Sequence, residues 1–122
     1  MSSAHILVQY VDNAAIVECL DTKLSDEMTI QQWSDEIIGA LSTCAVANRF
    51  IVSFRNVKFM SSSALRALIS LKAKADEAKV TLFLCNINPS NLEVFKITKL
   101  DSLFRITPSE IEAQRALIDN KF

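Results

Sequence analysis

The sequence predicts an α/β fold in which a small mixed β-sheet of four to five strands packs with about four helices. Three observations predict it. Two β-rich runs meet at a short turn near the N-terminus, two further apolar runs are short enough to be buried strands, and segments with helical periodicity follow these runs. Half of the 122 residues are apolar and 22% are charged. We therefore expect a single domain, residues 1–122, with one core.

The N-terminal third predicts a β-hairpin followed by a helix. The runs HILVQYV and AAIVECL flank Asp12 and Asn13, which tolerate the positive φ angles of a tight turn. Ser25 is then expected to cap a helix whose first turn holds Asp26 and Glu27, because carboxylates are favoured at the positive end of the helix dipole. Apolar residues recur along this helix at steps of three and four: Ile30, Trp33, Ile37, Leu41 and Cys44.

The middle of the chain predicts two buried strands and two helices. RFIVSF and VTLFLC are short and nearly continuously apolar, as in strands covered on both faces. A helix is predicted between them over residues 64–78. Asn88 followed by Pro89 predicts the start of a shorter helix, which carries Leu92 and Phe95. The buried face expected for the first of these helices consists of Leu65, Leu68, Ile69, Leu71 and Ala75.

The C-terminal segment predicts a brief edge strand and a last helix. SLFRI is the candidate strand. Thr107, Pro108, Ser109 and Glu110 then form a predicted capping box, with threonine as the cap and proline at the first helical position. The last helix is expected to bury Ile111, Leu117 and Ile118.

Charge and composition argue against several classes of function. The formal net charge is −1, so the chain lacks the basic surface that binds nucleic acid. No apolar segment approaches the roughly 20 residues of a membrane-spanning helix, and no basic region precedes the first apolar run, so we expect neither membrane insertion nor a signal peptide. Three separated cysteines, each in an apolar run, predict buried reduced thiols in a cytoplasmic protein: Cys19, Cys44 and Cys85.

The sequence predicts no catalytic centre, metal site or cofactor. Gly39 is the only glycine and falls within the first predicted helix, so no glycine-rich phosphate-binding loop can form. One histidine and three scattered cysteines do not make a zinc motif. His5 lies within the first predicted strand, where a structural role is expected rather than that of a base. We therefore do not expect an enzyme.

Three consecutive serines, Ser61, Ser62 and Ser63, stand between a strand-like run and a helix. One serine suffices to cap the helix, so a purely structural interpretation makes Ser61 or Ser62 the N-cap. A second interpretation is a regulatory one. A hydroxyl at an exposed helix start is accessible to a kinase, and a phosphate there adds about −1.5 to −2 charges that a docked partner would meet. The residues alone leave both interpretations open.

Two tracts resemble the STAS domain, which sulphate transporters and anti-sigma factor antagonists share. Residues 57–65, VKFMSSSAL, resemble the family tract V-x-F-[IM]-D-S-S-G-L, which opens a helix after a strand. A later tract resembles V-x-x-V-F-x-x-T-x-L-D-x-L-F. The likeness spans nearly the whole chain and implies a single STAS domain. The matching residues of the second tract are Phe95, Thr98, Leu100, Asp101, Leu103 and Phe104.

The resemblance implies a small bacterial regulator that binds an anti-sigma factor and so releases a sigma factor. In the family the anti-sigma factor is often a GHKL-type serine kinase, which phosphorylates the antagonist and ends the complex, and a PP2C-type phosphatase resets it. By position the phospho-acceptor is Ser62, with Ser61 and Ser63 as alternatives, and Asp26 matches the family's acidic residue near it. The implied partner-binding surface consists of Ser25, Asp26, Glu27, Ser61, Ser62, Ser63, Ala64 and Arg66.

Two positions depart from the family tract. Ser61 replaces the aspartate and Ala64 replaces the glycine. The first change removes a carboxylate beside the acceptor, and the second adds a methyl group where a partner backbone could approach. These departures favour an alternative function, a non-switching STAS module in a larger assembly such as a stressosome-like scaffold or the cytosolic side of a lipid transporter.

Overall fold

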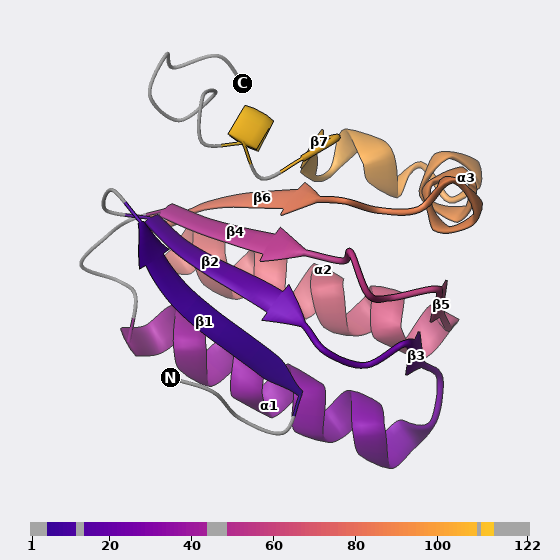
Figure 1. The fold of residues 1–122 in the computed structure, drawn as a ribbon, viewed down its shortest axis with the longest axis horizontal. Coiled ribbons are helices and arrows are strands. Elements are labelled where there is room, and N and C mark those ends of the chain that lie inside the picture. Colours follow the sequence, from indigo (N-terminus) through magenta and orange to yellow (C-terminus); the bar gives the residue numbers. More distant parts are fainter. Residues whose placement is uncertain (1–4, 12–13, 44–48, 110, 114–122) are drawn as a thin grey trace.

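The computed structural model describes residues 5–11, 14–43, 49–109 and 111–113. They form a five-stranded mixed sheet in the order β1-β2-β4-β6-β7, and helices α1 and α2 lie side by side against one of its faces (Figure 1). The predicted α/β class is confirmed. The strands are β1 Ile6–Val11, β2 Ala14–Cys19, β4 Arg49–Ser53, β6 Thr81–Cys85 and β7 Arg105–Thr107. The helices are α1 Glu27–Thr43, α2 Ser62–Glu77, α3 Pro89–Ile97 and the 3₁₀ helix η1 Leu100–Ser102, followed by helical residues 111–113.

The sheet combines one hairpin with three parallel pairings. Strands β1 and β2 are antiparallel, with Ile6 opposite Cys19 and Val11 opposite Ala14. The pairs β2–β4, β4–β6 and β6–β7 are parallel. Parallel neighbours need a crossover, and α1, α2 and α3 with η1 supply the three crossovers in turn. The predicted hairpin is therefore confirmed, while its turn residues Asp12 and Asn13 lie outside the described residues.

The main core lies between the sheet and helices α1 and α2. The predicted stripe of α1 is confirmed as buried at Ile30, Trp33, Ile37 and Leu41, and Cys44 lies outside the described residues. The indole N–H of Trp33 donates to the sulfur of Cys19 at 3.4 Å, which satisfies this polar group inside the core. Burial raises the pKa of the Cys19 thiol to about 12, so the thiol stays protonated. Cys19 and Cys85 are buried free thiols, as predicted.

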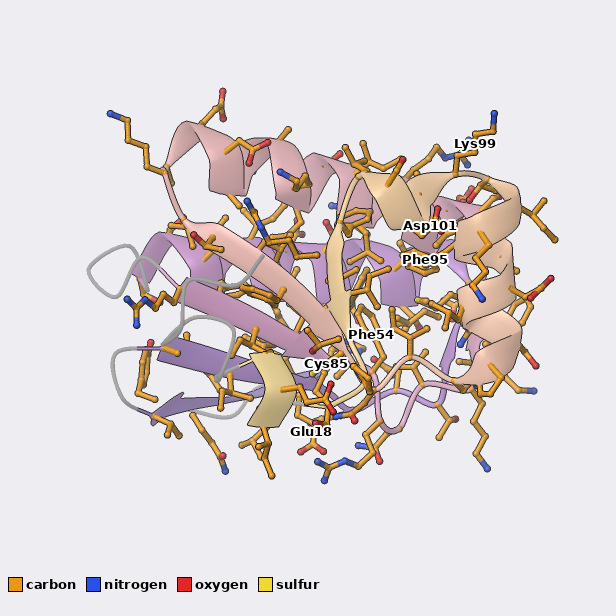
Figure 2. All side chains as sticks on the ribbon, turned by 90° about the horizontal axis from the view of Figure 1, so that it is seen from above. Glu18, Phe54, Cys85, Phe95, Lys99 and Asp101 are labelled. Carbon is orange, nitrogen blue, oxygen red and sulfur yellow. The ribbon has the colours of Figure 1, made fainter. Side chains whose placement is uncertain are left out.

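A second apolar cluster covers part of the opposite face of the sheet. It consists of Ala14, Ile16, Ile51, Phe83, Cys85 and Ala113. Strands β4 and β6 are thus buried on both faces, which explains why RFIVSF and VTLFLC do not alternate between apolar and polar residues. Figure 2 labels two fully buried aromatic residues, Phe54 after β4 and Phe95 of α3. Phe95 packs edge to face against Phe104, with 6.1 Å between ring centroids.

Two predicted core residues are exposed instead. Ile69 of α2 is exposed because the buried stripe runs through Leu65, Leu68 and Leu71, and Ile69 lies beyond its edge. Ile111 is exposed because the neighbouring Ala113 faces the sheet in its place. The other two core residues predicted for the last helix, Leu117 and Ile118, lie outside the described residues.

Two predicted helix caps are also displaced along the chain. Helix α1 begins at Glu27, and its cap is Asp26, whose carboxylate accepts from the Thr29 N–H at 2.9 Å, so the assignment to Ser25 was wrong. Thr107 does not cap the last helix because it belongs to strand β7. Ser109 takes that role, since its hydroxyl accepts from the Glu112 N–H at 3.3 Å. Glu110 of the predicted capping box lies outside the described residues.

A short two-stranded ribbon was not predicted. Strand β3, Lys23–Leu24, pairs in parallel with strand β5, Phe59–Met60. The ribbon lies beyond the carboxyl ends of β2 and β4, beside the starts of α1 and α2 (Figure 1). Strands of two residues carry no periodicity from which they could be recognised. This ribbon brings the two segments of the candidate site together.

Candidate functional site

The three serines at the start of α2 occupy different environments. Ser61 is the N-cap, and its hydroxyl accepts from the Ala64 N–H at 3.4 Å. The Ser63 hydroxyl accepts from the Arg66 guanidinium at 3.1 Å. Ser62 is exposed, and its hydroxyl has no hydrogen-bond partner within the described part of the chain. Helix α2 begins at Ser62, two residues before the predicted start, so this hydroxyl stands on the first helical residue.

The β3–β5 ribbon holds the serines next to the start of α1. Leu24 pairs with Met60, and the Leu24 carbonyl accepts from the Ser61 N–H at 2.9 Å. Because the two strands are parallel, the residues that follow each strand leave the ribbon on the same side. The segment Ser25 to Glu27 and the serine cluster are therefore neighbours in space, although more than 30 residues separate them in the sequence.

Asp26 supplies a fixed negative charge at this end of the molecule. Its side chain accepts a hydrogen bond from Thr29, and this bond holds the pKa of the Asp26 carboxyl below its usual value. Asp26 is therefore ionised at neutral pH. Ser25 and Glu27 on either side of it are exposed. The predicted acidic tract thus lies on the surface next to the serines.

Most of the predicted partner-binding residues are accessible at this end, but the side chain of Ala64 is not. Ala64 is completely buried against the core of the domain. Its methyl group packs inside the protein, so a partner cannot contact it. Arg66 is exposed one turn into α2.

Two exposed apolar side chains at the same end were not predicted as site residues. Phe59 is 50% exposed and Met28 is 71% exposed. Phe59 lies in β5 beside the buried Met60, so alternate residues of this short strand point in opposite directions. Met28 lies in the first turn of α1 and outside its buried stripe. The sequence offered only proximity as a signal: Met28 follows Glu27 directly, and Phe59 stands two residues before Ser61.

Two asparagines hold the ribbon from the side of α3. Asn88 caps α3, accepting from the Asn91 N–H at 2.8 Å, and its amide also donates to the Lys58 carbonyl at 3.1 Å. The Asn91 amide donates to the Val57 carbonyl at 3.5 Å. Residues 57 and 58 lead directly into β5, so α3 helps to fix the strand that presents the serines.

The chemistry available at this site is that of a hydroxyl group, carboxylates and a guanidinium. The described residues contain no group of three or more histidine, cysteine, aspartate or glutamate side chains that could hold a metal ion. Within the same residues, every buried side-chain nitrogen or oxygen has a hydrogen-bond partner. No helix in the described ranges has both the length and the apolar character needed to cross a membrane.

Comparison with known families decides which kind of domain this is. The STAS domain profile matches residues 8–113, which is most of the chain. The chain belongs to the STAS domain family. No curated protein matches it.

Solved structures show the same fold at low sequence identity. An anti-sigma factor antagonist (STAS) domain protein from Planctomyces limnophilus superposes with a TM-score of 0.82 at 18% identity, over 94% of this chain and 99% of that one. An anti-sigma factor antagonist from Mycobacterium paratuberculosis gives 0.76 at 20% identity, over 95% and 97% of the chains. The phosphorylated form of the Bacillus cell fate determinant SpoIIAA gives 0.66 at 19% identity, over 92% and 98%. The STAS fold expected from the sequence is therefore confirmed.

The second family tract of this STAS domain has a structural role. Phe95 and Phe104 are both buried and pack against each other. The Thr98 hydroxyl donates to the Val94 carbonyl at 2.7 Å at the end of α3. Lys99 then adopts a left-handed conformation with φ of 62°, which ends α3 and begins η1. Asp101 and Leu103 of the same tract are exposed, so the structural role covers only part of it.

Proposed function

We propose that this STAS domain is an anti-sigma factor antagonist whose binding to its partner is switched by phosphorylation of Ser62. The observation that carries the proposal is the difference between three neighbouring hydroxyl groups. Ser61 is engaged as a helix cap and Ser63 contacts Arg66, whereas Ser62 is exposed and has no hydrogen-bond partner in the described ranges. A kinase needs an accessible hydroxyl, and modification of Ser62 disturbs no contact of the fold.

The charges around Ser62 support a switch that acts on binding and leaves the fold intact. A phosphate on Ser62 would stand at the N-terminus of α2, where backbone N–H groups and the helix dipole favour negative charge. Arg66 lies four residues further along the same helix, within reach of such a phosphate. A partner docked on this surface would meet about −1.5 to −2 added charges. The carboxylates of Asp26 and Glu27 are neighbours of this position, so the phosphate would add to a group of like charges that a partner must accommodate.

The proposed partner is an anti-sigma factor of the GHKL-type serine kinase class, and a PP2C-type phosphatase would restore the binding form. SpoIIAA, which has the same fold, is described as an anti-sigma factor antagonist with an unphosphorylated and a phosphorylated form. The exposed side chains of Met28 and Phe59 offer apolar contact area next to the serine. In this proposal the STAS domain acts by binding alone, and the kinase and phosphatase carry out the chemistry.

Phosphate mapping tests the proposal. The test uses the wild-type chain, Ser62→Ala and the matched control Ser63→Ala. Each protein would be incubated with ATP and the GHKL-type serine kinases encoded in the same genome. Mass spectrometry would then locate the modified residues. We expect phosphate on Ser62 in the wild type and in Ser63→Ala, and none in Ser62→Ala. Phosphorylation that persists in Ser62→Ala would contradict the proposed acceptor. Absence of any phosphorylated form, also in protein from cells, would favour the non-switching module.

A further inference from the structure

His5 connects three segments of the chain at the edge of the sheet. It directly precedes β1, and its ring Nδ1 lies 2.7 Å from a carboxylate oxygen of Asp21, which follows β2. Its Nε2 lies 3.0 Å from the side-chain oxygen of Gln32 in α1. Its backbone N–H donates to the Glu36 carboxylate at 2.9 Å. The sequence predicted a structural role for His5 within the first strand, and the structure places it just before β1, at the centre of a polar cluster.

The geometry of the cluster favours a doubly protonated ring. Each ring nitrogen faces an oxygen acceptor, and a neutral imidazole has only one N–H to donate. The second oxygen of the Glu36 carboxylate lies 4.0 Å from Nε2, and the His5 side chain is only 13% exposed. Burial by itself lowers the pKa of His5. The hydrogen bonds to Asp21 and Gln32 raise it, and so do the negative charges of Asp21 and Glu36. Together these outweigh burial, so the pKa of His5 is raised above its usual value of 6.5. Asp26 at the start of α1 is a further carboxylate that interacts with His5, because the charge of His5 helps to lower the pKa of Asp26.

The cluster is linked to the serine site through the segment that follows Asp21. The carbonyl of the next residue, Thr22, accepts from the Lys58 N–H at 2.8 Å and from the Phe59 N–H at 3.3 Å. Two residues later the Leu24 carbonyl accepts from the Ser61 N–H. A side chain that fixes Asp21 therefore also restrains the strand that pairs with β5.

We propose that protonated His5 and Asp21 form a pH-sensitive clamp that positions the β3–β5 ribbon, and through it the start of α2 that carries Ser62. The clamp itself is independent of any partner, and its consequence for partner binding rests on the function proposed above. The folded state holds the proton more tightly than the unfolded chain. The stabilisation is therefore fully present below the unfolded-state pKa of about 6.5 and is lost as the pH rises through the higher folded-state value.

Amide hydrogen exchange on the intact chain tests the clamp without a partner. His5 is the only histidine, so its ring titration can be followed by NMR without ambiguity. The measured quantity is the protection factor of the Lys58 and Ser61 amides, corrected for the intrinsic pH dependence of exchange. We expect protection to fall by at least about threefold as the ring loses its proton, with the same midpoint as the ring titration.

Two variants sharpen the test. Asp21→Asn removes the charged acceptor and should abolish the pH dependence of protection at Lys58 and Ser61. Asp35→Asn is the matched control, because this carboxylate of α1 accepts from Gln31 at 2.9 Å and lies outside the cluster, so its pH profile should match the wild type. Protection that stays constant in the wild type while His5 titrates, or a His5 pKa at or below 6.5, would overturn the clamp. Neither result bears on whether Ser62 is phosphorylated.

Discussion

The three serines at the start of α2 share one side-chain chemistry and differ in what their hydroxyls contact. Ser61 and Ser63 are held by local hydrogen bonds to Ala64 and Arg66, and Ser62 is exposed between them. The sequence predicted a serine cap but could not choose between Ser61 and Ser62. The choice depends on a long-range contact, the hydrogen bond from the Ser61 N–H to the Leu24 carbonyl, which fixes where β5 ends and the helix begins.

A comparison of alanine variants separates the cap from the proposed acceptor. Ser61→Ala should lower the free energy of unfolding by about 0.5–1 kcal/mol, because it removes the N-cap bond of α2. Ser62→Ala should change it by less than about 0.5 kcal/mol, because the exposed hydroxyl stabilises nothing in the described fold. Urea denaturation measures both. A larger loss of stability in Ser62→Ala than in Ser61→Ala would contradict the assignment of the cap.

At the scale of elements, the long helices and buried strands could be predicted from the sequence, and the β3–β5 ribbon could not. Helix α1 has four buried residues at helical spacing, and β4 and β6 are nearly continuously apolar, so each carries its own signal. The ribbon has two residues in each strand and exists because distant segments meet.

The displaced caps have the same origin as the missed ribbon. Several neighbouring residues at each helix start can serve as a cap, and pairing of the preceding strand decides among them. Thr107 pairs with Cys85 in β7, which leaves Ser109 to cap the helical residues that follow. In α1 the cap is Asp26, the second residue after the paired Leu24 of β3.

The ribbon should contribute measurably to stability through Leu24. This side chain is completely buried, so Leu24→Ala should lower the free energy of unfolding by about 2–5 kcal/mol through lost burial and the cavity left behind. Leu20→Ala is the matched control, because Leu20 lies in the same link and is exposed. Its effect should be clearly smaller. Equal losses in chemical denaturation would show that the ribbon is not packed on the core as described.

At the scale of the whole molecule, the domain is a sheet covered by apolar packing on both faces, with its candidate site at one end. Helices α1 and α2 cover one face of the sheet, and a second apolar cluster lies on the other. Both helix starts meet at the ribbon (Figure 1). A phosphate on this end would change the surface that a partner meets and leave the core untouched. Stability and binding should therefore respond separately to modification of Ser62.

The decisive measurement is a binding affinity. Calorimetry under identical salt and pH would compare how tightly the cognate anti-sigma kinase binds the unphosphorylated chain and the Ser62-phosphorylated chain. We predict at least about tenfold weaker binding of the phosphorylated form, with circular dichroism spectra of the free chains unchanged. Equal affinities of the two forms would contradict the account.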